Sequence, residues 1–151
     1  MKLSEAGLAL LKRSEGFKSR VYTDAHGMPA IGYGHRLLRL ETFPNGIEEA
    51  QAAEILLKDV REAEEVVTRL VRVALAQGQF DALVDFCFNM GQRRLAASEL
   101  LADLNRGRYQ AAAEQLLLWD HVGASENLAL KKRREAEFHL WHGQLERLAM
   151  V

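Results

Sequence analysis

Two carboxylic acids lie nine residues apart in the stretch EGFKSRVYTDAHGMPAIGYGH, which covers residues 15–35. Glu15 ends a helical pattern and Asp24 lies in a polar turn, so the two acids come from different elements. Acid–base catalysis needs one protonated and one ionised group. The negative end of a helix and burial beside Phe17 favour the uncharged form of Glu15, whereas Asp24 should stay ionised. This division suits glycoside hydrolysis, although a helix end followed by an Asx-turn presents the same spacing.

The elements around these acids can be predicted from local patterns. Residues 3–14 form a helical pattern that Ser4 caps and Gly16 ends. Strand-forming residues flank the turn DAHG, where Gly27 can adopt a positive φ, so we expect a small hairpin over residues 17–35. Apolar residues then recur at helical spacing from Ala53 to Leu70, which predicts a long helix. The remaining chain predicts short helices, with QFDALVDFCFNMG buried among its neighbours because it is apolar almost all round. The fold class is therefore α+β, mainly helical.

Bulk properties narrow the function. The chain has 151 residues and a net charge of −1, which predicts one compact domain and no nucleic-acid partner. No apolar stretch is long enough for membrane insertion, and the N-terminus lacks the features of a signal peptide. Cys87 is the single cysteine and no HExxH spacing occurs, so we expect no disulfide, no metal and no cofactor.

Several motifs occur together in the order and spacing of one family. They are SEG at 14–16, YTD at 22–24, IGYGH at 31–35, QFDALVDFCFNMG at 79–91, SELLADLNRGRYQAAAEQL at 98–116, Trp119 and KKRREAE at 131–137. In this combination the chain resembles the phage-type lysozymes, which are muramidases and endolysins of lytic phages. The resemblance implies a bilobal fold over a single lysozyme domain, 1–151. It implies a β-lobe at 16–46, a connecting helix at 47–70, and a helical lobe built from 1–15 and 70–151.

The resemblance also assigns roles to single residues. Glu15 matches the family's general acid and Asp24 the carboxylate that activates water, while Arg133 would orient Glu15 and His35 would pair with a carboxylate at the base of the hairpin. Three further residues would line the substrate groove: Arg36, Phe88 and Ser98. Each of these three also has a structural interpretation, as a solvated charge, a core aromatic and a helix N-cap, respectively.

Position 30 departs from the family pattern. Ala30 stands where the family normally has a threonine whose hydroxyl holds the attacking water. An alanine side chain has no donor or acceptor, so we expect weakened hydrolysis. We expect the Ala30 methyl at the lip of the groove rather than in the core. Ala30→Thr should then raise activity and leave thermal stability almost unchanged.

The leading functional hypothesis is a soluble, monomeric endolysin that cleaves peptidoglycan glycan strands. It would be made in the host cytoplasm and depend on a holin for release to the cell wall in the periplasm. One alternative is a catalytically impaired peptidoglycan-binding or transglycosylating protein on the same fold, favoured by Ala30. Another is a helical nucleic-acid binder that uses KKRREAE, against which the balanced charge argues; the block KKRR reads as a solvated helix face.

Overall fold

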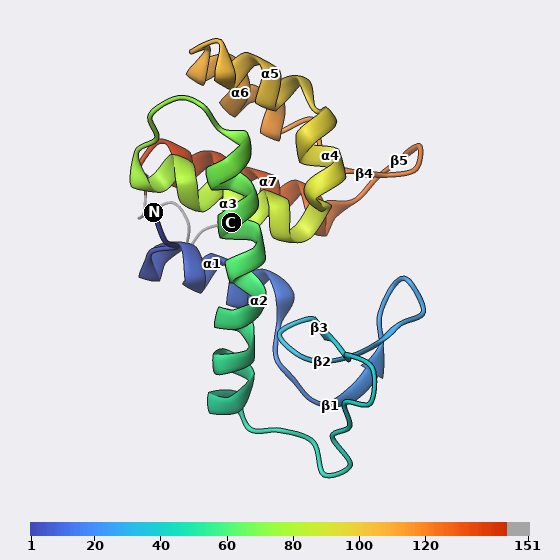
Figure 1. The fold of residues 1–151 in the computed structure, drawn as a ribbon. Helices are drawn as coiled ribbons and strands as arrows, with labels where there is room; N and C mark the ends of the chain where they lie inside the picture. Colours follow the sequence, from blue (N-terminus) through green and yellow to red (C-terminus); the bar gives the residue numbers. More distant parts are fainter. Residues whose placement is uncertain (145–151) are drawn as a thin grey trace. The chain divides into compact units, whose positions relative to one another are not determined.

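The computed structural model describes residues 1–144, which form a mainly helical fold with two small antiparallel sheets (Figure 1). This confirms the predicted α+β class. In chain order the elements are α1 (Glu5–Glu15), β1 (Lys18–Thr23), β2 (Pro29–Gly32), β3 (His35–Arg36), α2 (Glu49–Leu70), α3 (Gln77–Met90), α4 (Gln92–Ala97), α5 (Glu99–Asn105), α6 (Tyr109–Leu116), β4 (His121–Val122), β5 (Ser125–Glu126) and α7 (Leu128–Trp141).

The chain divides into two compact units. The sheet unit comprises Leu11–Glu62, and the helical unit comprises Met1–Leu10 together with Ala63–Val151. Both boundaries fall inside helices, α1 and α2, so each of these helices contributes residues to both units. The β-lobe predicted at 16–46 lies wholly within the sheet unit.

The ends of α1 are set locally, as the sequence predicted. The Ser4 hydroxyl accepts a hydrogen bond from the Gly7 backbone N–H at 3.2 Å, which is an N-cap contact. At the other end Gly16 adopts a φ of +72°, a left-handed conformation that favours glycine. The helix therefore stops directly after Glu15 and leaves this acid on its last residue.

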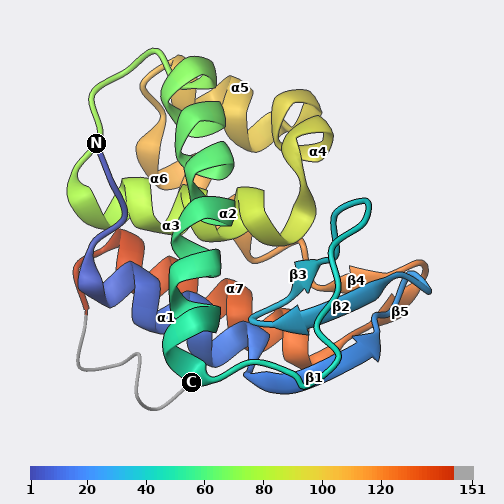
Figure 2. The ribbon, with the colours of Figure 1, turned by 60° about the horizontal axis from the view of Figure 1, so that its bottom comes forward.

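The sheet unit contains three antiparallel strands with β2 in the centre, as Figure 2 shows. The predicted hairpin is present: β1 and β2 flank a turn in which Asp24 donates its backbone N–H to Met28 O at 2.8 Å and Gly27 has a φ of +77°. The sequence did not predict β3, which has only two residues. Across the sheet, Ala30 is the register partner of both Tyr22 and Arg36.

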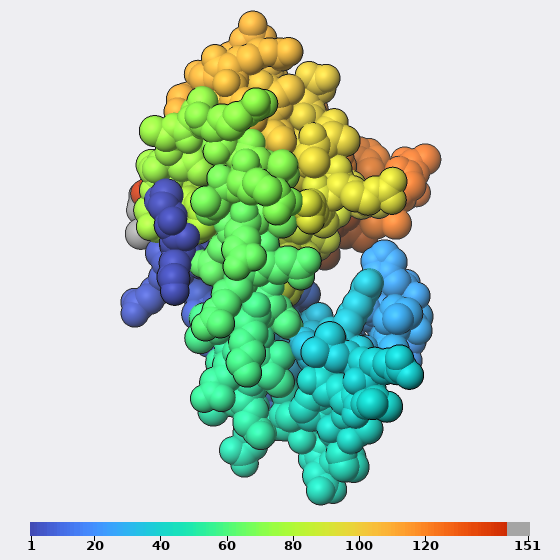
Figure 3. Space-filling view, in the orientation of Figure 1, coloured from blue at the N-terminus to red at the C-terminus, as the bar shows by residue number. Residues whose placement is uncertain are grey.

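The helical unit is organised around α3, which packs against α7. Residues 80–87 of α3 are all buried, which confirms the interpretation of QFDALVDFCFNMG as a central helix. The short β4–β5 hairpin lies on the surface of this unit, where the space-filling view shows it projecting (Figure 3). Among the described residues, no helix combines the length and the apolar character that crossing a bilayer requires.

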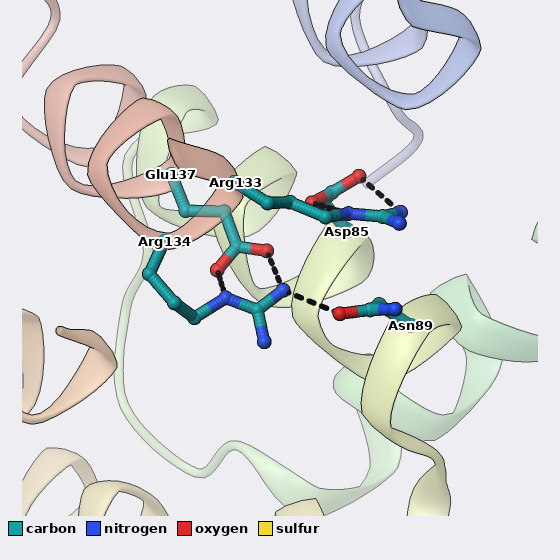
Figure 4. A network of polar contacts seen from close by, with 5 residues as sticks. All are labelled: Asp85, Asn89, Arg133, Arg134 and Glu137. Carbon is teal, nitrogen blue, oxygen red and sulfur yellow. Dashed lines mark hydrogen bonds and ion pairs between the residues drawn. The ribbon is translucent and has the colours of Figure 1, made fainter. Parts of the chain in front are cut away.

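A buried polar network joins α3 to α7 (Figure 4). Arg133 donates from Nε and Nη2 to the two carboxylate oxygens of Asp85, at 2.9 and 3.0 Å. Arg134 donates to Asn89 at 2.9 Å and to Glu137 at 2.8 Å. Burial raises the pKa of Glu137 well above its ordinary value, and the neighbouring charge of Arg134 offsets only part of this effect.

The interpretation of KKRR as a solvated face was wrong for its second half. Arg133 is 8% exposed and Arg134 is fully buried. The sequence showed four consecutive cations, but successive residues of a helix point in different directions. Two of the four therefore point inward, where they form ion pairs with acids on α3 and α7.

Candidate active site

Asp24 is held by three hydrogen-bond donors in the turn between β1 and β2. Its Oδ1 accepts the backbone N–H groups of His26 and Met28 at 2.8 and 2.9 Å, and its Oδ2 accepts Nε–H of Arg36 at 2.9 Å. These contacts, led by the Met28 N–H, lower the pKa of Asp24 below its usual value despite some desolvation. The expected ionised state of Asp24 therefore has a structural basis.

Glu15 lies partly buried at the end of α1, beside the turn between β2 and β3. A Cβ atom on Gly34 would lie 2.9 Å from Glu15 Oε2, and Gly34 has a φ of +69°. Only glycine fits this close approach without strain. Gly34, the second glycine of the GYG sequence, therefore leaves room for the Glu15 carboxyl group, a role that the sequence did not reveal.

Tyr22 on β1 links the two acids electrostatically. Burial raises the pKa of its phenol first, and the charges of Glu15 and of Asp24 each raise it further. A helix end and a turn thus each supply a carboxyl group whose charge acts on Tyr22. The sequence marked Tyr22 as part of a motif but did not assign it to the site.

Ala30 is 1% exposed, so its predicted position at an accessible lip is wrong. The reason lies in the register of the sheet. Residues directly opposite in an antiparallel sheet share a face, which puts Arg36 beside Ala30. Arg36 on this face reaches from β3 to Asp24, which follows β1, so its side chain extends toward the far side of the sheet.

His35 is held between two carboxylates. Its Nδ1 lies 2.7 Å from Asp59 Oδ2 and its Nε2 lies 2.8 Å from Glu41 Oε1, so the predicted pairing is present twice. Burial lowers the pKa of His35, but the hydrogen bonds to Glu41 and Asp59 outweigh it and the net shift is upward. Glu41 also accepts the Leu38 N–H, which ties the loop after β3 to this cluster. No local pattern relates His35 to Asp59, which is 24 residues away on α2.

The other predicted site residues belong to the helical unit, whereas both acids belong to the sheet unit. Arg133 forms the buried pair with Asp85, a partner that the sequence did not suggest, and its expected pairing with Glu15 stays a prediction. Phe88 is half-buried on α3. Ser98 is 7% exposed and caps α5 by accepting the Leu101 N–H at 3.1 Å, which is the structural alternative considered for it. The groove roles of Phe88 and Ser98 stay predictions.

Known proteins share this arrangement over nearly the whole chain. The muramidase domain of SpmX from Asticaccaulis excentricus has a TM-score of 0.84, with 33% identity, over 93% of this chain and 97% of that domain. A variant of P22 lysozyme has the same TM-score and 36% identity, over 94% of this chain and 99% of the other. The fold is thus that of a lysozyme-like protein.

Sequence comparison gives the family. The phage lysozyme model matches residues 12–137. The endolysin of Salmonella phage P22 is 38% identical over 137 residues, which cover 89% of this chain and 94% of the relative. The endolysin of Bacillus phage B103 is 39% identical over 140 residues, although the chain spans only 52% of that longer protein. The chain belongs to the phage lysozyme family.

Proposed function

We propose that this protein is an endolysin-type muramidase that hydrolyses the β-1,4 bond between N-acetylmuramic acid and N-acetylglucosamine in peptidoglycan. The observation that carries the proposal is the different surroundings of two acids in the sheet unit. Three donors lower the pKa of Asp24 and favour its ionised form, whereas Glu15 lies partly buried at a helix end, and the charges of both act on Tyr22. Family membership supports the same chemistry.

In this mechanism Glu15 gives its proton to the glycosidic oxygen as the bond to the anomeric carbon breaks. A water molecule attacks that carbon from the opposite face and passes a proton to Asp24. The bond electrons stay with the leaving oxygen, which becomes a hydroxyl group, and the anomeric carbon takes the hydroxyl group of the water. We expect the two carboxyl groups to lie ~6.5 to 9.5 Å apart, which leaves room for water and gives inversion at the anomeric carbon.

Ala30 should weaken this hydrolysis without abolishing it. The side chain offers no hydroxyl to orient the attacking water, which costs a hydrogen bond of ~0.5 to 1.5 kcal/mol. The paired acids are intact, which argues against a site that has lost its function. A peptidoglycan-binding protein of low turnover is the second candidate, and Ala30 is the observation that favours it.

In the cell we propose the role of an endolysin that acts as a monomer. It would be made in the host cytoplasm, reach the periplasm after a holin opens the inner membrane, and cut the glycan strands there. The endolysin relatives support this role.

The decisive experiment is mass spectrometry of the material released from purified sacculi. Muropeptides with N-acetylmuramic acid at the reducing end show a muramidase, and an anhydro sugar shows a transglycosylase. Binding to sacculi without release supports the second candidate.

Glu15→Gln gives the matched test of the acid, because the amide preserves shape but cannot protonate the leaving oxygen. We expect less than about a tenth of the activity and an unchanged fold by circular dichroism. An active Gln variant would exclude Glu15 as the acid.

A further inference from the structure

A cluster of three residues spans the sheet and consists of Arg36, Ala30 and Asp24. Ala30 on the central strand pairs in register with Arg36 on β3, so the two side chains share a face of the sheet. Arg36 Nε donates to Asp24 Oδ2, beyond the end of β1, at 2.9 Å. The methyl group of Ala30 is covered, while the Arg36 side chain itself is 54% exposed. A longer side chain at position 30 would compete with Arg36 for space on this face of the sheet.

We propose that Arg36 is the positioning residue of the catalytic base, and that the small side chain of Ala30 leaves room for it on this face of the sheet. This inference rests on the proposed function, because it takes Asp24 as the base. It differs from the groove role that the family resemblance gave to Arg36, since the guanidinium acts here on a residue of the protein rather than on the sugar.

The hydrogen bonds explain what Arg36 adds. Two backbone N–H groups hold only Oδ1 of Asp24, whereas Arg36 holds Oδ2, so all three together fix the plane of the carboxylate. An ionised carboxylate oxygen can accept two hydrogen bonds, so Oδ2 keeps one acceptor position for the proton of the attacking water. Arg36 thereby directs this acceptor position and keeps the base ionised.

The charges around Asp24 single out Arg36. The charges of Asp24 and Glu15 both act on Tyr22 on β1, and neither a phenol nor a carboxyl group supplies a positive charge. The turn contributes backbone N–H groups of His26 and Met28. Within the described part of the chain, Arg36 is the cation that hydrogen-bonds Asp24. Removal of its charge should shift the titration of Asp24 to higher pH.

A purely structural role predicts something different. An exposed ion pair contributes little to the stability of a fold. Loss of Arg36 should therefore leave the melting temperature nearly unchanged, and its effect should appear in turnover and in pH dependence. These readouts separate a positioning role from a stabilising one.

The experiment compares Arg36→Met, Arg36→Lys and the matched control Arg39→Met, which removes an exposed arginine three residues further along. The Asp24 carboxyl carbon is titrated by ¹³C NMR, and muropeptide release from sacculi is followed against pH. We expect Arg36→Met to move both the Asp24 titration and the acidic limb of kcat/KM to higher pH. We also expect kcat to fall about tenfold with little change in KM.

The lysine variant tests charge against geometry. It should retain most of the Asp24 titration shift but recover only part of kcat, because an ammonium lacks the planar fork of a guanidinium. Ala30→Leu, which competes for this space, should reproduce the Arg36→Met phenotype. The Arg39→Met control should behave as the unaltered chain.

The outcomes that overturn the inference are distinct from those that overturn the proposed function. If Asp24 titrates at the same pH in Arg36→Met and Arg39→Met, the inference is wrong, while muropeptide release by the unaltered chain keeps the proposed function. If the unaltered chain releases no muropeptides, the proposed function fails and the role of Asp24 as base fails with it.

Discussion

Replacing Ala30 with threonine should raise muramidase turnover relative to valine at the same position. Threonine and valine have nearly the same shape, so each crowds Arg36 on the shared face of the sheet to a similar degree. They differ in one hydroxyl group, which is the group able to orient the attacking water. The ratio of the two variants therefore isolates the hydroxyl, whereas comparison with the unaltered chain mixes it with crowding.

The expected sizes of the gain in turnover and of the loss in stability can be estimated separately. A well-placed hydrogen bond of ~1.4 kcal/mol at the transition state corresponds to a tenfold rate, so kcat of the threonine variant should be about tenfold that of the valine variant. Two added heavy atoms at a residue that is 1% exposed should cost ~1 to 3 kcal/mol of folding free energy in either variant. Each kcal/mol lowers the melting temperature of a chain of this size by ~2 to 4 °C. The burial of Ala30 thus replaces the expectation of unchanged thermal stability.

The assay follows muropeptide release from sacculi at a temperature below the melting transition of both variants, over a range of substrate concentrations. Glycan affinity should be alike in the two, because the water is engaged after binding. Equal kcat values for threonine and valine would refute the reasoning and show that another group holds the water.

Two further predictions concern stability. His35→Asn should weaken the hydrogen bonds to two carboxylates, each worth a net ~1.5 to 3 kcal/mol. The pKa of His35 is raised on folding, so its contribution is fully present below the unfolded value of ~6.5 and is lost as the pH rises through the folded value. The pKa of Glu41 is lowered, so its contribution is present above its unfolded value of ~4.3 and is lost as the pH falls through the folded value. Urea unfolding should therefore show a larger loss for His35→Asn at pH 5.5 than at pH 8.5, and an equal loss at both would exclude the charged pair. In the helical unit, Asp85→Asn removes the carboxylate from the buried ion pair with Arg133 and should cost ~3 to 5 kcal/mol. Asp103→Asn, whose ion pairs with Arg106 and Arg108 involve exposed arginines, is the control that should cost less in the same urea titration.

The sequence determined the features that depend on neighbouring residues. The N-cap at Ser4, the helix stop at Gly16 and the turn at Gly27 each follow from the conformational preference of one residue in its local frame. Together they place Glu15 at a helix end and Asp24 in a tight turn. The fold class, the buried character of α3 and the family membership were predicted for the same reason, because periodicity and motif spacing are properties of the chain itself.

Only the tertiary structure decided which partner each charged side chain has. Arg36 on β3 pairs with Asp24, which follows β1, on the face that Ala30 shares. His35 meets Asp59 through a contact between a strand and α2. Arg133 and Arg134 are buried because they form ion pairs with acids on α3 and α7. In the sequence they only follow two lysines in a run of four positive charges. Ion pairs form between residues that are distant in sequence, and their existence depends on strand register and helix packing, which local propensity does not encode.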